Sequence, residues 1–117
     1  MPSPALLLGL ALIATALILG AAEPFTVATW NLENYLDQPT AKRPAKPAES
    51  KSTVHASLLE LRADIIALQE VGDTNCLHKL RDALKRSGLE YPHWEYLVAR
   101  DDEIHLAVLS RFPITAR

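Results

Sequence analysis

Residues 64–70 read DIIALQE, a nearly continuous apolar run that ends in a carboxylate. A run of this length, rich in isoleucine and leucine, is typical of a strand that is buried on both faces. Residues 25–30, FTVATW, form a second candidate strand of β-branched and aromatic residues, with Asn31 directly after it. The sequence therefore predicts two strands that each lead into a polar residue.

Apolar residues at helical spacing occupy the segments that follow these strands. They are Val54, Leu58 and Leu61 in one segment, and Leu77, Leu80 and Leu84 in the other. The first stripe predicts a helix that begins near Ser50 or Ser52. The second predicts a helix that Gly88 brings to an end.

Two further strands are predicted toward the end of the chain, at residues 95–99 (EYLVA) and 104–110 (IHLAVLS), joined by a short polar connection. The order strand, helix, strand, helix, strand, strand indicates an α/β fold that opens with parallel crossovers and then turns antiparallel. A sheet that stops after Pro113 would keep an open edge, which complete domains avoid. We therefore expect an incomplete domain.

Asn31 and Glu70 are the candidate site residues. In sheets with helical crossovers, ligands collect at the carboxyl ends of the strands, where both residues are predicted to lie. Their oxygens suit Mg²⁺, which typically takes one or two carboxylates together with a substrate phosphate. From the residues alone a second interpretation stays open, in which Asn31 caps a turn and Glu70 is merely exposed.

Three strings narrow this choice: residues 29–34 (TWNLEN), 64–71 (DIIALQEV) and 109–114 (LSRFPI). In this order, over roughly residues 25–117, they resemble the opening third to half of the endonuclease/exonuclease/phosphatase family. That family includes DNase I-like nucleases, apurinic endonucleases, sphingomyelinases and inositol phosphatases. The second string is the most specific of the three, and the third is supporting.

The resemblance implies the N-terminal part of a four-layered α/β sandwich, with two mixed sheets face to face and helices outside. It implies a phosphoesterase dependent on Mg²⁺ or Mn²⁺, with Glu70 as the principal metal ligand and Asn31 beside the metal and the scissile phosphate. The expected reaction is phosphodiester hydrolysis. Nucleic acid is the first substrate class, and a phospholipid or sugar phosphate is the alternative.

The later motifs of the family are a Gly-Asp-Phe-Asn type segment, a histidine-containing strand and a Ser-Asp-His segment, and none occurs in these 117 residues. The resemblance places the general base and its aspartate in those segments. The four histidines match none of them: His55, His78, His93 and His105. A second hypothesis is therefore that this chain is a non-catalytic N-terminal fragment.

Residues 1–22 carry no charged side chain and end in Gly20-Ala21-Ala22 after a long apolar run. This pattern predicts a secretory signal peptide, which leaves residues 23–117 as a secreted or periplasmic domain. The alternative is an uncleaved segment that anchors the chain in a membrane. The net charge of −2 gives no basic field that would indicate nucleic-acid binding, and no protein partner is evident.

The remaining polar and aromatic residues have structural interpretations. Residues 38–50 are expected to be a solvated, proline-stiffened loop, although its cations could approach a phosphate backbone (Lys42, Arg43, Lys46). Arg111 is expected in an ion pair, Trp30 in the core and Cys76 as a small buried residue. In DNase I-like members an arginine that reaches DNA often stands two residues after the metal glutamate. Gly72 stands there in this chain, which weakens a double-strand nuclease interpretation.

Overall fold

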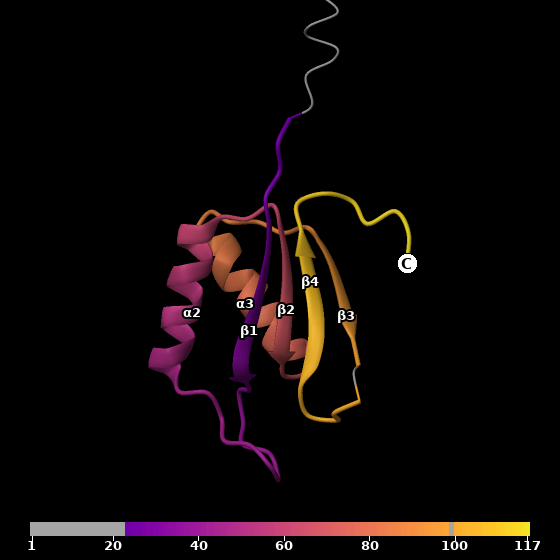
Figure 1. The fold of residues 1–117 in the computed structure, drawn as a ribbon. Coiled ribbons are helices and arrows are strands. Elements are labelled where there is room, and N and C mark those ends of the chain that lie inside the picture. The colour runs from indigo at the N-terminus through magenta and orange to yellow at the C-terminus, as the bar shows by residue number, and fades with distance from the viewer. Residues whose placement is uncertain (1–22, 99) are drawn as a thin grey trace, which may run out of the picture.

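Four strands form one sheet with the spatial order β1-β2-β4-β3 in a computed structural model that describes residues 23–98 and 100–117 (Figure 1). The strands are β1 (Val27–Tyr35), β2 (Ile65–Val71), β3 (His93–Leu97) and β4 (His105–Ser110), and the helices are α2 (Ala48–Leu61) and α3 (Thr74–Arg86). Both helices lie on the same side of the sheet. The predicted α/β order of elements is confirmed.

The sheet contains both parallel and antiparallel pairs, as predicted from the helical crossover and the antiparallel strands that follow it. Helix α2 connects β1 to β2, and these two strands pair in parallel. Strand β4 lies antiparallel to β2 on one side and antiparallel to β3 on the other. The carboxyl ends of β1 and β2 therefore lie at the same edge of the sheet, at the bottom of Figure 1.

The core lies between the sheet and the two helices. Ile66 and Leu68 of β2 are fully buried there, together with Leu58 of α2 and Leu77 of α3. The alternate residues of β2 are only half-buried on the opposite face, so the prediction that this strand is buried on both faces is wrong for the part of the chain described. The reason is that α2 and α3 cover the same face.

Several predicted boundaries differ from the structure; for example, β3 spans His93–Leu97 rather than residues 95–99. Helix α2 begins at Ala48, earlier than the serines suggested, because Pro47 at the N-cap has φ −59°, a backbone angle compatible with a helix start. Strand β1 does not end before Asn31 but continues to Tyr35 through an irregular segment. Gly88 adopts φ +89° just after α3, which confirms its role in ending that helix.

The predicted signal peptide, residues 1–22, lies outside the described residues. Within residues 23–98 and 100–117, no helix has both the length and the apolar character that crossing a bilayer requires.

Candidate functional site

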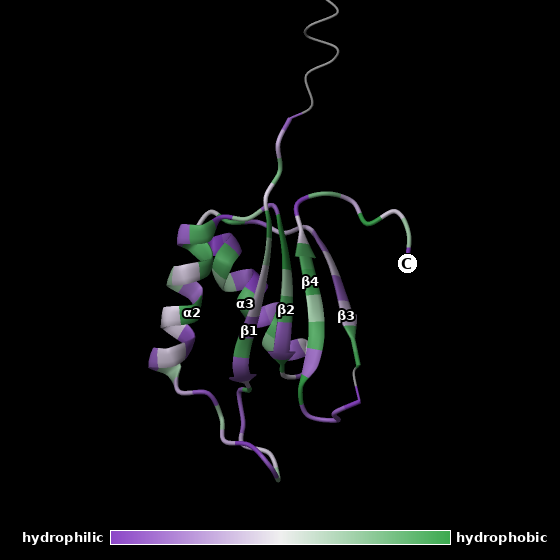
Figure 2. Ribbon diagram, viewed as in Figure 1, coloured by the Kyte–Doolittle hydropathy of each residue, from purple (hydrophilic) through white to green (hydrophobic). Residues whose placement is uncertain are grey.

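Asn31 and Glu70 lie at the shared carboxyl edge of β1 and β2. Asn31 pairs in register with Gln69, the residue directly before Glu70. Asn31 is exposed and Glu70 is half-buried. Figure 2 shows the contrast along β2, whose middle is hydrophobic and whose carboxyl end is hydrophilic. The structure therefore brings the two predicted site residues to one rim of the sheet.

The backbone at this rim is irregular. Between paired positions, β1 advances four residues from Asn31 to Tyr35 while β2 advances only two, from Gln69 to Val71. Three rim residues take left-handed φ angles: 57° at Glu33, 50° at Asn34 and 59° at Glu70. Such angles are uncommon outside glycine, cost on the order of 1 kcal/mol each and gather at functional sites. We name residues 31–35 and 69–71 the bulged rim.

Hydrogen bonds hold the bulged rim in this shape. The Glu33 N–H donates to Asn31 Oδ1 at 2.9 Å, and the Lys46 ammonium donates to the Glu33 carbonyl at 3.0 Å. The Leu36 N–H donates to the Asn34 carbonyl at 2.8 Å. Several separate contacts therefore fix a conformation that the residues themselves do not favour.

The bond to Glu33 fixes which way the Asn31 carboxamide faces. A backbone N–H can only donate, so the atom that it meets must be the side-chain oxygen and not the nitrogen. The Nδ2 group then lies on the other side of the carboxamide, and none of the described residues forms a hydrogen bond with it. Asn31 thus presents two N–H donors at the rim.

Glu70 carries a carboxylate that forms neither an ion pair nor a hydrogen bond with the described residues, although it is half-buried. Other partly buried carboxylates are paired: Asp37 with Lys51 and Lys79, and Asp64 with Arg111. No group of three or more His, Cys, Asp or Glu side chains within the described ranges could hold a metal ion. One free carboxylate nevertheless fits Mg²⁺, which keeps several waters and takes oxygens from a substrate phosphate.

Gly72 brings the end of β2 close to the end of β1. Its N–H donates to the Tyr35 carbonyl at 2.9 Å, and its carbonyl accepts from the Tyr96 hydroxyl at 2.8 Å. A Cβ at this position would lie 2.9 Å from the Tyr35 oxygen, 2.9 Å from Cys76 Sγ and 3.0 Å from Leu36 Cδ2. No longer residue fits here without a shift of its neighbours.

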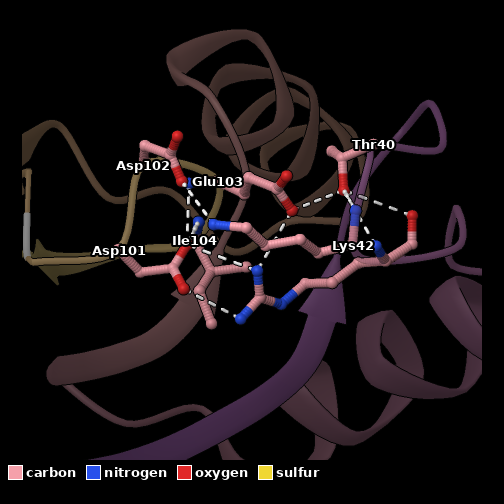
Figure 3. A network of polar contacts seen from close by, with 7 residues as sticks. Thr40, Lys42, Asp101, Asp102, Glu103 and Ile104 are labelled. Atoms are coloured by element: carbon pink, nitrogen blue, oxygen red, sulfur yellow. Dashed lines mark hydrogen bonds and ion pairs between the residues drawn. The ribbon is translucent and has the colours of Figure 1, made fainter.

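The loop after β1 is held by a polar cluster rather than being simply solvated (Figure 3). Arg43 donates to Asp101 at 2.9 and 3.3 Å and to Glu103 at 3.1 Å, and Lys42 pairs with Asp102 at 3.4 Å. Backbone N–H donation from Glu103, together with Arg43, holds the pKa of Asp101 below its usual value. We name these five residues the loop clasp, together with Thr40, whose hydroxyl donates to the Glu103 carboxylate. Lys42 and Arg43 are therefore engaged with carboxylates.

The remaining sequence interpretations concern residues away from the rim. Arg111 pairs with Asp64 at 3.2 Å, and Trp30 packs against the core, as predicted. Cys76 is buried, which raises the pKa of its thiol to about 11 and confirms a structural role. His55 and His78, predicted at the surface, are half-buried because α2 and α3 pack closely and His78 lies against Trp94.

The sequence indicated the two ends of the site but not the bulge between them. Asn34 tolerates left-handed angles more readily than most residues, whereas no local pattern marks Glu33 or Glu70 for them. In the sequence, Lys46 is only one of several loop cations, and nothing there distinguishes it from Lys42 and Arg43.

Comparison with known proteins gives one match. The model of the endonuclease/exonuclease/phosphatase family matches residues 28–117, and this range includes the three strings as well as Asn31 and Glu70. The four-stranded sheet and its two helices are compatible with part of a DNase I-like fold. Neither the curated proteins nor the solved structures contain a match to this chain.

Proposed function

Because the chain belongs to the endonuclease/exonuclease/phosphatase family, we propose that it acts as a metal-dependent phosphoesterase, which hydrolyses phosphodiester bonds at the bulged rim. The observation that carries the proposal is the half-buried carboxylate of Glu70 at the end of a parallel strand, which has no hydrogen-bond or ion-pair partner among the described residues. Nucleic acid is the first substrate class, and a phospholipid or sugar phosphate is the second.

Glu70 and Asn31 divide the work at the rim in this proposal. Glu70 would hold Mg²⁺ or Mn²⁺, for which its oxygens are suited. The bound ion supplies Lewis-acid polarisation of a phosphoryl oxygen. Asn31, whose Nδ2 hydrogens are free of other described partners, would donate to a phosphoryl oxygen as negative charge develops on it. Asn31 Oδ1 keeps one lone pair, with which it could also serve as a metal ligand or accept a hydrogen bond from a metal-bound water.

Water attack also needs a group that accepts the proton of the water. The family resemblance assigns that group to a His–Asp pair in segments other than the three strings of this chain. The proposal therefore gives the described residues the roles of metal ligand and phosphate donor. The hydrolysis rate of the unmodified chain with Mg²⁺ and with EDTA decides whether these 117 residues are sufficient for turnover.

Replacement of Glu70 with glutamine tests the proposal in the full chain. Hydrolysis of bis(4-nitrophenyl) phosphate is measured with Mg²⁺ and with EDTA, beside Glu60→Gln as a matched control on the exposed surface of α2. We expect Glu70→Gln to abolish the Mg²⁺-stimulated rate and Glu60→Gln to keep it. Equal rates in Mg²⁺ and EDTA would support the non-catalytic hypothesis, and full activity of Glu70→Gln would remove Glu70 from the site.

The substrate class is tested separately with plasmid DNA, a single-stranded oligonucleotide and phosphatidylcholine vesicles. We expect cleavage of the nucleic acids ahead of the lipid. Gly72 counts against a contact with duplex DNA at that position, because even one added carbon would meet the Tyr35 carbonyl. Preference for the single-stranded oligonucleotide over the plasmid would agree with that geometry.

We also propose export of the protein, secreted or into a periplasm. The uncharged apolar stretch and the small residues at 20–22 support cleavage before Glu23. An uncleaved segment that anchors the chain in a membrane is the alternative.

A further inference from the structure

Lys46 differs from the other cations of the loop between β1 and α2. Lys42 and Arg43 each pair with carboxylates of the loop clasp. Among the described residues, Lys46 pairs with no carboxylate and donates instead to the backbone carbonyl of Glu33 at 3.0 Å. The ammonium of Lys46 is therefore directed to the bulged rim, and its positive charge is not neutralised there.

The backbone of Lys46 is also fixed. Its N–H donates to the Leu36 carbonyl at 2.9 Å, so the loop closes at this point and returns beside the strand that it left. Pro47 follows and restricts the backbone of Lys46 to extended angles. An anchored backbone reduces the conformational freedom that the long side chain must lose to reach Glu33.

A continuous chain of contacts leads from Lys46 to Asn31. The ammonium meets the Glu33 carbonyl, and the Glu33 N–H meets Asn31 Oδ1 at 2.9 Å. Glu33 between them has a left-handed φ of 57°, which it does not adopt by preference. A charged donor on its carbonyl is a stronger support than a neutral one, and Lys46 therefore supports the Glu33 backbone that contacts the Asn31 carboxamide.

We propose that Lys46 is a positioning residue of the candidate site: it holds Glu33 in the left-handed conformation that keeps the Nδ2 donors of Asn31 turned to the phosphoester. The inference rests on the proposed function for its chemical purpose, but its structural content can be measured without turnover. A lysine that is merely a surface residue would leave Glu33 and Asn31 unchanged when replaced.

Three variants of the full chain test this inference: Lys46→Met, which removes the charge and the donor, Lys46→Arg, which keeps both, and Lys42→Met as a matched loop cation. Hydrogen exchange of the Glu33 N–H and the side-chain amide signals of Asn31 are measured by NMR, with the buried Leu80 amide of α3 as an internal reference. We expect Lys46→Met to speed Glu33 exchange about threefold, because one solvent-exposed, charge-assisted hydrogen bond is lost from a local opening equilibrium.

The Asn31 side-chain signals should move in Lys46→Met, and Lys46→Arg should restore both readouts. Lys42→Met should change neither, because Lys42 pairs with Asp102 and contacts neither Glu33 nor Asn31. Unchanged Glu33 exchange in Lys46→Met would overturn the proposal. It would also be overturned by an equal change in Lys42→Met, or by a loss of protection at Leu80 as large as that at Glu33, which would indicate a role in the whole fold.

A titration with Mg²⁺ and dimethyl phosphate separates this inference from the proposed function. The Asn31 signals should respond in the wild-type chain and in Lys46→Arg, and the response should be lost in Lys46→Met. A wild-type chain that does not respond would count against the phosphoester site. The exchange of the Glu33 N–H alone decides the role of Lys46.

Discussion

Replacing Gly72 with alanine tests how closely the ends of β1 and β2 approach each other. The added Cβ would lie 2.9 Å from the Tyr35 carbonyl oxygen and 2.9 Å from Cys76 Sγ. The sulfur belongs to a side chain and has some freedom to move, whereas the carbonyl belongs to the backbone of a paired strand. Relief of the contact therefore requires β1 and β2 to separate at the bulged rim.

The expected cost follows from these contacts. Overpacking by one carbon in a filled interior costs roughly 1–3 kcal/mol. A shift of Gly72 would in addition weaken its hydrogen bonds to Tyr35 and Tyr96, at about 1 kcal/mol each. Together these effects amount to about 3–5 kcal/mol, which for a domain of this size corresponds to a fall in Tm of roughly 12–40 °C.

Urea and thermal unfolding of Gly72→Ala, followed by circular dichroism, give this loss of stability. Gly88→Ala is the matched control, because Gly88 has φ +89° but nothing within 4 Å of an added Cβ. It should lose only about 1 kcal/mol, through backbone strain. A free energy of unfolding for Gly72→Ala within about 0.5 kcal/mol of wild type would refute the reasoning, since surface substitutions without a specific mechanism give changes of that size.

Two further predictions concern acid stability and export. Thr26 N–H donation, reinforced by Arg111, holds the pKa of Asp64 below its usual value, and Lys51 does the same for Asp37. Carboxylates with lowered folded pKa values contribute stability above their unfolded pKa of about 4, and this stability is lost as the pH falls through the folded pKa. The urea concentration at the unfolding midpoint should therefore decrease as the pH is lowered below about 4, and it should decrease less steeply in Asp64→Asn. Equal slopes in the two proteins would contradict this account. Expression with residues 1–22 should give an exported product whose mass is that of a chain beginning at Glu23. A full-length product in the membrane fraction would favour the membrane anchor instead.

The order of the elements and the pairing of β1 with β2 could be predicted from the sequence, because apolar spacing reports which face of an element is buried. The α2 crossover then dictated parallel neighbours. The same reasoning brought Asn31 and Glu70 to one edge. It could not tell that Ala67 and Gln69 face away from both helices, since an apolar strand looks alike whether one or two layers cover it.

The detail of the site was beyond sequence reasoning for a different reason. The Glu33 carbonyl in the bulge accepts from a lysine 13 residues away, and Arg43 in the clasp pairs with carboxylates 58 and 60 residues away. Residues so far apart in the sequence leave no local pattern from which their contact could be predicted. From the sequence, charged residues in a proline-rich stretch are expected to be solvated. In the structure, Arg43 is held by two carboxylates.

The loop clasp also sets an order in which the protein can fold. Strand β1, α2 and β2 can associate once residue 71 has been synthesised, but Arg43 must wait for Asp101 and Glu103, which come after two further elements, α3 and β3. Contacts of long sequence separation form late, because the intervening chain must first lose its entropy. The loop that carries Lys46 is thus secured by residues between β3 and β4, and we expect the bulged rim to become ordered only after this hairpin has formed.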